Sequence, residues 1–134
     1  MLTPIQISLV LEDDEGSRFV LRAILEQAGF KVLECAQAAE AIDICQIYPA
    51  SIVIMVSDVV LRGRGGPETI RQIHALRPDM PILFVSGYPL DILENRGLLD
   101  PLDMAAKNRA FLQKPFTAQA LLGVIRLLMD PASS

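Results

Sequence analysis

Short runs rich in valine and isoleucine alternate along this chain of 134 residues with longer segments that have helical periodicity. Five such runs are expected to be strands, because β-branched residues favour extended structure and each run is only a few residues long. Strands that alternate with helices form a parallel sheet covered on both faces, since right-handed crossovers leave few other topologies. The sequence therefore predicts an α/β fold with a five-stranded parallel sheet.

Turn and cap residues give the bounds of the expected elements. Strands are expected at 5–11, 31–35, 51–57, 81–85 and 110–113, and helices at about 17–28, 38–48, 67–77 and 117–129. Gly29 ends the first helix, and Thr117 is expected to cap the last one. The segment between the last two strands contains Pro89, Gly97 and Pro101, so the fourth helix is expected to be short or irregular.

The composition bounds the domain organisation and excludes several classes of protein. The length of 134 residues predicts one domain over 1–134 with its core at about 5–129, and a hydrophobic fraction of 51% with 5% aromatic residues predicts that its interior is aliphatic. A net charge of −4 without a basic stripe argues against direct nucleic-acid binding. The apolar runs are too short for membrane insertion and the N-terminus lacks a signal-peptide pattern, so a cytoplasmic location is expected.

Cysteine and histidine give no sign of a transition-metal site. Cys35 and Cys45 are not at metal-ligand spacing and are expected to be buried as small hydrophobic residues. His74 is the only histidine and has no partner at such a spacing, so a solvated or half-buried position is expected.

Polar side chains follow four of the expected strands. Acidic residues 12–14 follow the first strand, Asp58 the third, Ser86 the fourth and Lys114 the fifth. The carboxyl ends of parallel strands meet at one edge of the sheet, where open α/β proteins bind their ligands. Carboxylates gathered there repel one another unless a cation lies between them, and hard divalent ions take oxygen ligands. The sequence thus predicts a site for Mg²⁺ or Mn²⁺.

Asp58 has the position of a nucleophile. It follows a wholly apolar strand that holds it on one side, and a carboxylate held in this way can attack a phosphoryl group. Lys114 would pair with the same phosphoryl group, and the Ser86 hydroxyl would donate a hydrogen bond to it. Arg62 and Arg64 are interpreted as loop charges that also raise the positive potential near Asp58.

Each of these residues also has a purely structural interpretation. The acidic run 12–15 could complement a helix dipole, Asp58 could cap a loop and Ser86 a turn. Lys114 and Pro115 could simply end a strand. The occurrence of all of them at strand ends, in this order, favours a shared site.

Together these segments resemble the response-regulator receiver domain of two-component signalling, in the CheY-like superfamily. The resemblance extends from Ile5 to Met129 and depends on "LVLEDDEGSR", "SDVVLRGRGGPE", "PILFVSGYP" and "FLQKPF". It implies a flavodoxin-like fold with strand order 2-1-3-4-5. The style of the last two segments is similar to receivers attached to hybrid sensor kinases.

The resemblance also implies a role for each site residue. Asp58 would accept a phosphoryl group from a histidine kinase or a histidine phosphotransfer protein. Asp14 would bind the metal directly and Asp13 through water, with Asp58 and the backbone carbonyl of Val60 completing the shell. The family places a catalytic hydroxyl at Ser86 and an invariant lysine at Lys114.

A conformational switch follows from the same resemblance. The phosphoryl group would draw the Ser86 hydroxyl inward and let Phe111 rotate inward, which changes the surface offered to an unknown downstream protein. The bond from Lys114 to Pro115 is often cis in relatives. Leu61 and Arg62 stand where relatives usually carry Met-Pro, so the loop lacks its proline and the phosphoryl lifetime is open.

Two other functions are alternatives to phosphoryl acceptance. One is a receiver-like interaction domain that is not phosphorylated. The other is a phosphatase of the haloacid dehalogenase type, which needs an Asp two residues after the nucleophile where this chain has Val60. A receiver would not be an enzyme beyond its own phosphoryl acceptance and loss. The sequence leaves open whether the receiver is stand-alone or part of a hybrid kinase.

Overall fold

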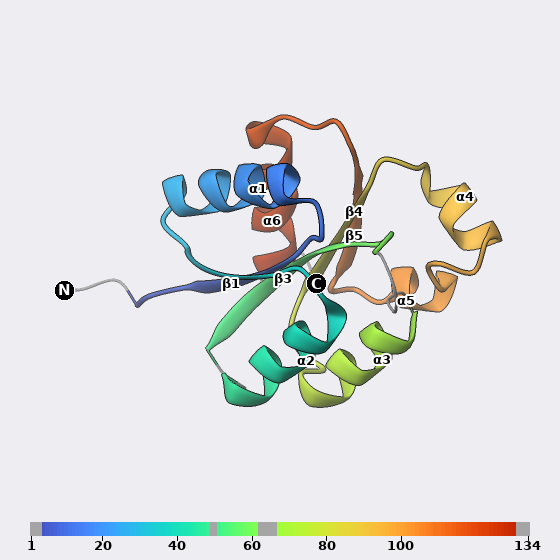
Figure 1. Ribbon diagram of the computed structural model, residues 1–134, viewed down its shortest axis with the longest axis horizontal. Helices are drawn as coiled ribbons and strands as arrows, with labels where there is room; N and C mark the ends of the chain where they lie inside the picture. Colours follow the sequence, from blue (N-terminus) through green and yellow to red (C-terminus); the bar gives the residue numbers. More distant parts are fainter. Residues whose placement is uncertain (1–3, 49–50, 62–66, 131–134) are drawn as a thin grey trace.

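A five-stranded parallel sheet forms the centre of the computed structural model, which describes residues 4–48, 51–61 and 67–130 (Figure 1). The strands are β1 (Ile7–Leu11), β2 (Lys31–Cys35), β3 (Ile52–Asp58), β4 (Ile82–Ser86) and β5 (Arg109–Gln113). Their order in the sheet is β2-β1-β3-β4-β5, and every neighbouring pair is parallel. The predicted fold class and strand order are confirmed.

Helices cover both faces of the sheet. The helices are α1 (Glu15–Gln27), α2 (Ala38–Ile47), α3 (Pro67–Leu76), α4 (Leu90–Asn95), α5 (Pro101–Ala105) and α6 (Ala118–Met129). Figure 1 shows α1 and α6 together on one side and α2 and α3 on the other. This two-sided cover explains why β3 and β4 are apolar almost throughout, since side chains on both of their faces are buried.

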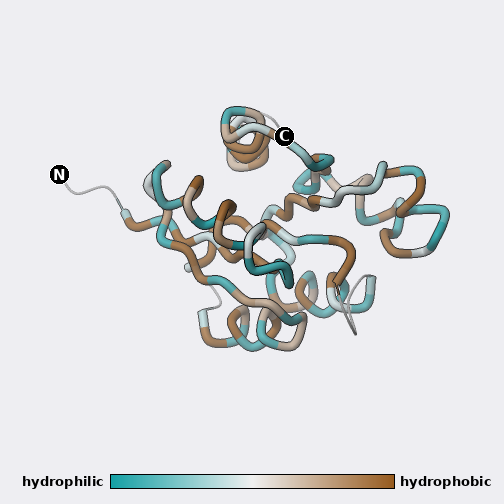
Figure 2. The backbone as a smooth tube through the Cα atoms, turned by 45° about the horizontal axis from the view of Figure 1, so that its top comes forward, coloured by the Kyte–Doolittle hydropathy of each residue, from teal (hydrophilic) through white to brown (hydrophobic). Residues whose placement is uncertain are grey.

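Side chains of the strands alternate between two hydrophobic clusters. Val10, Val56 and Val85 pack in the cluster that includes residues of α1 and α6. Residues directly before or after these valines in the same strands, such as Leu11 and Phe84, pack in the cluster on the α2 and α3 side. The alternation is the period of two expected for a strand buried on both faces. Figure 2 shows the result, with apolar strand segments in the centre and helices that alternate between apolar and polar residues.

The helix ends follow from local capping. The Asp14 side chain accepts a hydrogen bond from the Ser17 amide at the start of α1, and the Thr117 hydroxyl accepts one from the Ala120 amide at the start of α6. Gly29 has a φ of 102° just after α1, in the left-handed region that favours glycine. The predicted cap at Thr117 and stop at Gly29 are confirmed.

The connection between β4 and β5 contains two short helices in place of one long helix. Gly97 has a φ of 70°, and Pro101 opens α5, so the backbone turns between them. Leu93 and Leu99 are nevertheless buried in the core, which anchors the connection to the sheet. The prediction of a short or irregular fourth helix is confirmed.

Cysteine and histidine occupy the kinds of position that the sequence indicated. Cys35 and Cys45 are free and buried, as predicted. His74 is exposed, and its Nδ1 atom lies 3.1 Å from Nη2 of Arg109.

Within the described ranges, no helix is both long and apolar enough to cross a membrane.

Candidate functional site

Three carboxylates converge at the carboxyl edge of the sheet. Glu12 and Asp13 follow β1, and Asp58 is the last residue of the neighbouring strand β3. The register of the two strands pairs Leu11 with Ser57, which brings the residues that follow them to the same level. One oxygen from each carboxylate lies within 4.8 Å of the others. The site therefore arises from strand pairing.

Lys114 lies against two of these carboxylates. Its Nζ donates to Oε1 of Glu12 at 2.5 Å and to Oδ2 of Asp58 at 3.2 Å. The backbone of Lys114 is fixed as well, because its N–H donates to the carbonyl of Ser86 at 2.8 Å. The bond from Lys114 to Pro115 is cis, as the resemblance implied. One ammonium thus joins the ends of β1 and β3 to the segment after β5.

Glu12 is the most deeply buried member of the cluster, with no exposed surface. Its N–H donates to the carbonyl of Cys35 at 3.1 Å, and its Oε2 accepts from the Asp14 amide at 3.3 Å. Burial raises the pKa of Glu12 to about 7, with the hydrogen bond to Asp58 acting in the same direction and Lys114 opposing it. Near neutral pH, then, the metal-free cluster is only partly ionised.

The pKa of Lys114 moves in the direction that keeps its charge. Burial alone lowers this pKa, but the hydrogen bond to Glu12 and the charges of Asp58 and Glu12 outweigh burial and raise it. Lys114 therefore keeps its positive charge beside the carboxylates of Glu12 and Asp58.

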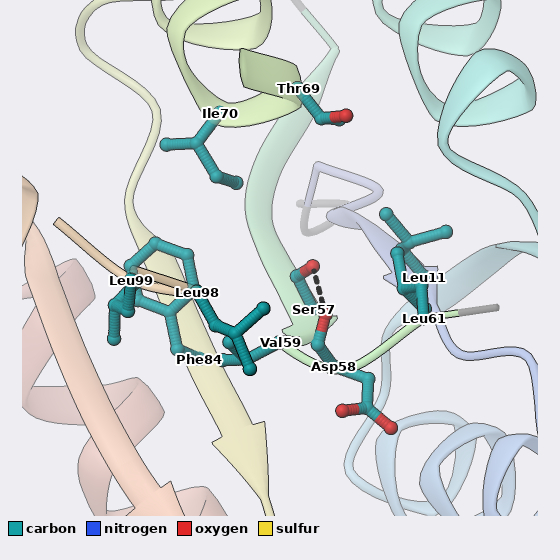
Figure 3. Close-up of a pocket in the computed structure, with 10 residues that line it drawn as sticks. All are labelled: Leu11, Ser57, Asp58, Val59, Leu61, Thr69, Ile70, Phe84, Leu98 and Leu99. Carbon is teal, nitrogen blue, oxygen red and sulfur yellow. Dashed lines mark hydrogen bonds between the residues drawn. The ribbon is translucent and has the colours of Figure 1, made fainter. Parts of the chain in front are cut away.

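Asp58 faces the acidic cluster. Figure 3 shows its carboxylate pointing away from a small cavity of about 10 Å³ that is lined by Ile70, Leu98 and other mainly apolar residues. Asp58 is only 9% exposed, and its Oδ1 accepts from the Val60 amide at 3.0 Å. Ser57 donates from Oγ to the Asp58 carbonyl at 3.1 Å. The Val60 amide and Lys114 hold the carboxylate at the acidic cluster, while Ser57 contacts only the backbone of Asp58.

The other predicted site residues are placed as follows. Ser86 ends β4 with 1% exposure, and its Oγ accepts from the Tyr88 amide at 3.1 Å. Val60 is 38% exposed, and Phe111 is partly buried against the cluster on the α2 and α3 side. Arg62 and Arg64 lie outside the described residues.

Asp14 has a different place from the one expected. Its Oδ2 accepts from the Ser17 amide at 2.8 Å as the N-cap of α1, and Glu12 occupies the position in the cluster that Asp14 was expected to fill. The reason is that α1 begins at Glu15, two residues earlier than predicted, which places the cap on Asp14. The signal that could have identified Glu12 is its position immediately after the last residue of β1.

Similarity to known proteins identifies the family of this chain. The chain matches the response regulator receiver domain family over residues 8–126 and belongs to that family. It is 31% identical to the sensor kinase CckA of Brucella abortus over 91% of this chain and 12% of CckA. It is 29% identical to the response regulator receiver protein CpdR of Brucella abortus over 92% of this chain and 97% of CpdR. The chain thus spans a small part of one relative and nearly all of another.

Solved structures agree with this family and with the flavodoxin-like fold. The receiver domain of the hybrid histidine kinase CckA superimposes with a TM-score of 0.74 at 25% identity, over 92% of this chain and 99% of that domain. A response regulator receiver protein from Sinorhizobium medicae reaches a TM-score of 0.78 at 23% identity, over 95% and 96% of the two chains, and supports the fold alone. The chain is a receiver domain of two-component systems, and such domains typically act in signalling without being enzymes.

Proposed function

We propose that this domain accepts a phosphoryl group on Asp58 in the presence of Mg²⁺, and that the modified domain presents a changed surface to its partner. The unit that does this is the receiver core, at about residues 5–129. The observation that carries the proposal is the convergence of Glu12, Asp13, Asp58 and Lys114 at one edge of the sheet.

The donor atoms fit a hard divalent cation. Glu12, Asp13 and Asp58 offer carboxylate oxygens that already lie close together, and the backbone carbonyl of Val60 is proposed as a further ligand. We assign Glu12 and Asp13 to the acidic pair, in place of Asp13 and Asp14, because the Asp14 side chain caps α1. When bound, Mg²⁺ or Mn²⁺ would supply positive charge that offsets the repulsion between an anionic donor and these carboxylates.

The protein's own residues bind and orient the reacting groups. A carboxylate oxygen of Asp58 forms the new bond to phosphorus while the bond from phosphorus to the donor breaks, and the departing group keeps the electron pair. Lys114 already contacts Asp58 and is proposed to pair with a phosphoryl oxygen. Ser86 accepts from the Tyr88 amide through its Oγ, so its hydroxyl proton can be donated to the phosphoryl group.

The change of surface is proposed to start at Ser86 and Phe111. Ser86 pairs with Gln113 in the register of β4 and β5, while Phe111 lies two residues earlier on β5. A shift of Ser86 toward the phosphoryl group would open space on this side of the sheet for the partly buried Phe111 ring. Phe carries no hydroxyl, so this movement would change packing without a new hydrogen bond from the ring.

The proposed phosphodonor is a histidine kinase or a histidine phosphotransfer protein, and the downstream protein is unassigned. Relatives described as a sensor kinase and as response regulators support this class of donor. A mainly apolar groove lined by Val20, Pro115 and Phe116 opens beside Lys114. Exposed apolar surface of this kind favours protein contacts, and its place beside Lys114 suits a donor that must reach Asp58.

The test is the intact mass of the protein after incubation with acetyl phosphate. The wild type is expected to gain one phosphoryl group with Mg²⁺ and none with a chelator. Asp58→Ala should gain none, whereas Asp43→Ala, which removes an exposed carboxylate from α2, should behave as the wild type. Labelling that survives Asp58→Ala would overturn the site assignment. The absence of both Mg²⁺ binding and labelling in the wild type would favour an interaction domain that is not phosphorylated.

A further inference from the structure

Arg18 contacts the backbone of the acidic segment from the first turns of α1. Its Nη1 donates to the carbonyl oxygen of Glu12 at 2.8 Å, and the Arg18 side chain is 19% exposed. The Arg18 amide donates to the carbonyl of Asp14 at 2.9 Å, so its place in the helix is fixed by the same turn that Asp14 caps. Arg18 therefore joins α1 to the peptide that follows Glu12.

Glu34 orients the Arg18 guanidinium from the neighbouring strand. Its Oε1 lies 3.8 Å from Nε of Arg18, and the strand register places Glu34 opposite Val10, whose side chain packs on the α1 side of the sheet. The same carboxylate lies 3.3 Å from Nη1 of Arg22, one turn further along α1. Arg22 also pairs with Glu26 at 3.4 Å.

The peptide between Glu12 and Asp13 determines the direction of two carboxylates at once. The Glu12 N–H is already bound to the carbonyl of Cys35, which fixes the residue on its N-terminal side. The bond from Arg18 fixes the carbonyl on the C-terminal side. Hydrogen bonds with a charged donor are roughly twice as strong as neutral ones, so Arg18 resists rotation of this peptide.

We infer that Arg18, oriented by Glu34, is a positioning residue that holds the Glu12–Asp13 peptide so that both carboxylates face Asp58. Arg18 acts through the backbone of the acidic segment, while the proposed phosphoryl transfer takes place at Asp58. Its effect on Mg²⁺ and on phosphoryl transfer rests on the proposed function, whereas its effect on the peptide is independent of that function.

The experiment compares Arg18→Ala, Arg18→Lys and the matched control Arg22→Ala. Both alanine variants remove one positive charge from α1 and one contact with Glu34, but only Arg18 is bound to the Glu12 carbonyl. The measurements are the ¹³C resonance of the Glu12 carbonyl in metal-free protein, the dissociation constant for Mg²⁺, and the dependence of labelling rate on acetyl phosphate.

We expect Arg18→Ala to move the Glu12 carbonyl resonance upfield and to weaken Mg²⁺ binding about tenfold, as is typical when a residue that orients a metal ligand is removed. Arg18→Lys keeps a charged donor without the planar fork, so it should restore part of both effects. Arg22→Ala should leave the resonance and the Mg²⁺ affinity as in the wild type.

Equal losses in Arg18→Ala and Arg22→Ala would overturn the inference, because they would show a general effect of charge. An unchanged Glu12 resonance in Arg18→Ala would overturn it as well. If the wild type bound no Mg²⁺ and took up no phosphoryl group, the proposed function would fail and the carbonyl resonance alone would decide the role of Arg18. If Arg18→Ala did not fold, Arg18→Lys and Glu34→Gln would decide it by the same resonance.

Discussion

Charged residues are buried at both edges of the sheet, but the two groups differ in how their charges are satisfied. At the carboxyl edge, Lys114 lies against Glu12 and Asp58. At the opposite edge, Arg109 begins β5 with 7% exposure, and its Nη1 donates to the carbonyl of Met80 at 3.2 Å. Its Nη2 lies 3.1 Å from Nδ1 of His74, which joins the end of α3 to β5.

The two edges of the sheet differ in role: the edge at Arg109 stabilises the fold, whereas the carboxyl edge forms the candidate site. Arg109 contacts backbone carbonyls and a ring nitrogen of His74, and burial lowers its pKa, so this edge fixes α3, β4 and β5 relative to one another. The carboxyl edge instead crowds Glu12, Asp13 and Asp58 together, an arrangement that burial and repulsion make unfavourable on its own. Local arrangements of this kind persist at functional sites, where a ligand relieves them.

Replacing the buried cation at each edge gives the largest expected contrast. Lys114→Met should slow phosphoryl incorporation about 10²–10³-fold, because a fixed positive group at the transferred phosphoryl is lost. Arg109→Met, which keeps a long apolar side chain at the other edge, should leave the labelling rate unchanged at a temperature where both variants are folded. The measurement is the rate of mass gain with acetyl phosphate and Mg²⁺. Similar losses in the two variants would remove the functional distinction between the edges.

The pH dependence of stability should also differ between the two edges of the sheet. The pKa of Glu12 is about 7 in the folded protein and 4.5 as its ordinary value, so the folded state holds an extra proton between these pH values. Its contribution to stability is therefore full below pH 4.5 and is lost as the pH rises through about 7, by up to about 3 kcal/mol. Urea unfolding in chelator at several pH values measures this loss.

Variants identify the residue responsible for that loss. Glu12→Gln should flatten the curve between these pH values. Burial also raises the pKa of Asp103 at the opposite edge, so Asp103→Asn is the matched control and should flatten it less. A wild-type slope that persists in Glu12→Gln would show that Glu12 is not the titrating group.

The smallest expected effect concerns Asp14. Asp14→Ala should lower the free energy of unfolding by about 1 kcal/mol through loss of the N-cap, while Asp14→Ser keeps a capping oxygen and should cost less. Neither change should alter the affinity for Mg²⁺, whereas Asp13→Ser should reduce it. Calorimetric titration with Mg²⁺ compares the three. Equal weakening of Mg²⁺ binding by Asp14→Ser and Asp13→Ser would show that Asp14 belongs to the metal site.

The sequence predicted the fold and most of the site because both depend on strong local signals. The apolar run of β3 ends in Asp58, and "FLQKPF" places Lys114 just after β5, so the edge rule for parallel sheets predicts that the two residues lie close together. The choice among acidic residues 12–14 depended instead on where α1 begins. Because α1 starts two residues earlier than predicted, Asp14 is its N-cap, and we propose Glu12 in its place as a metal ligand.

Contacts between distant segments were the part that the sequence did not provide. His74 and Arg109 are 35 residues apart and meet where the last turn of α3 lies beside the start of β5. Nothing in the periodicity of either segment indicates the pairing. Arg18 and Glu12 are six residues apart, but their contact depends on the angle at which α1 leaves β1, which the sequence pattern does not specify.

Titration of the protein with Mn²⁺, followed by amide NMR, tests most directly whether the carboxyl edge is a cation site. Paramagnetic broadening is expected first at the amides of Asp13, Val59 and Lys114, with Asp103 and Arg109 at the other edge unaffected. Broadening that begins at Asp103 and Arg109, or none at all at either edge, would contradict the assignment.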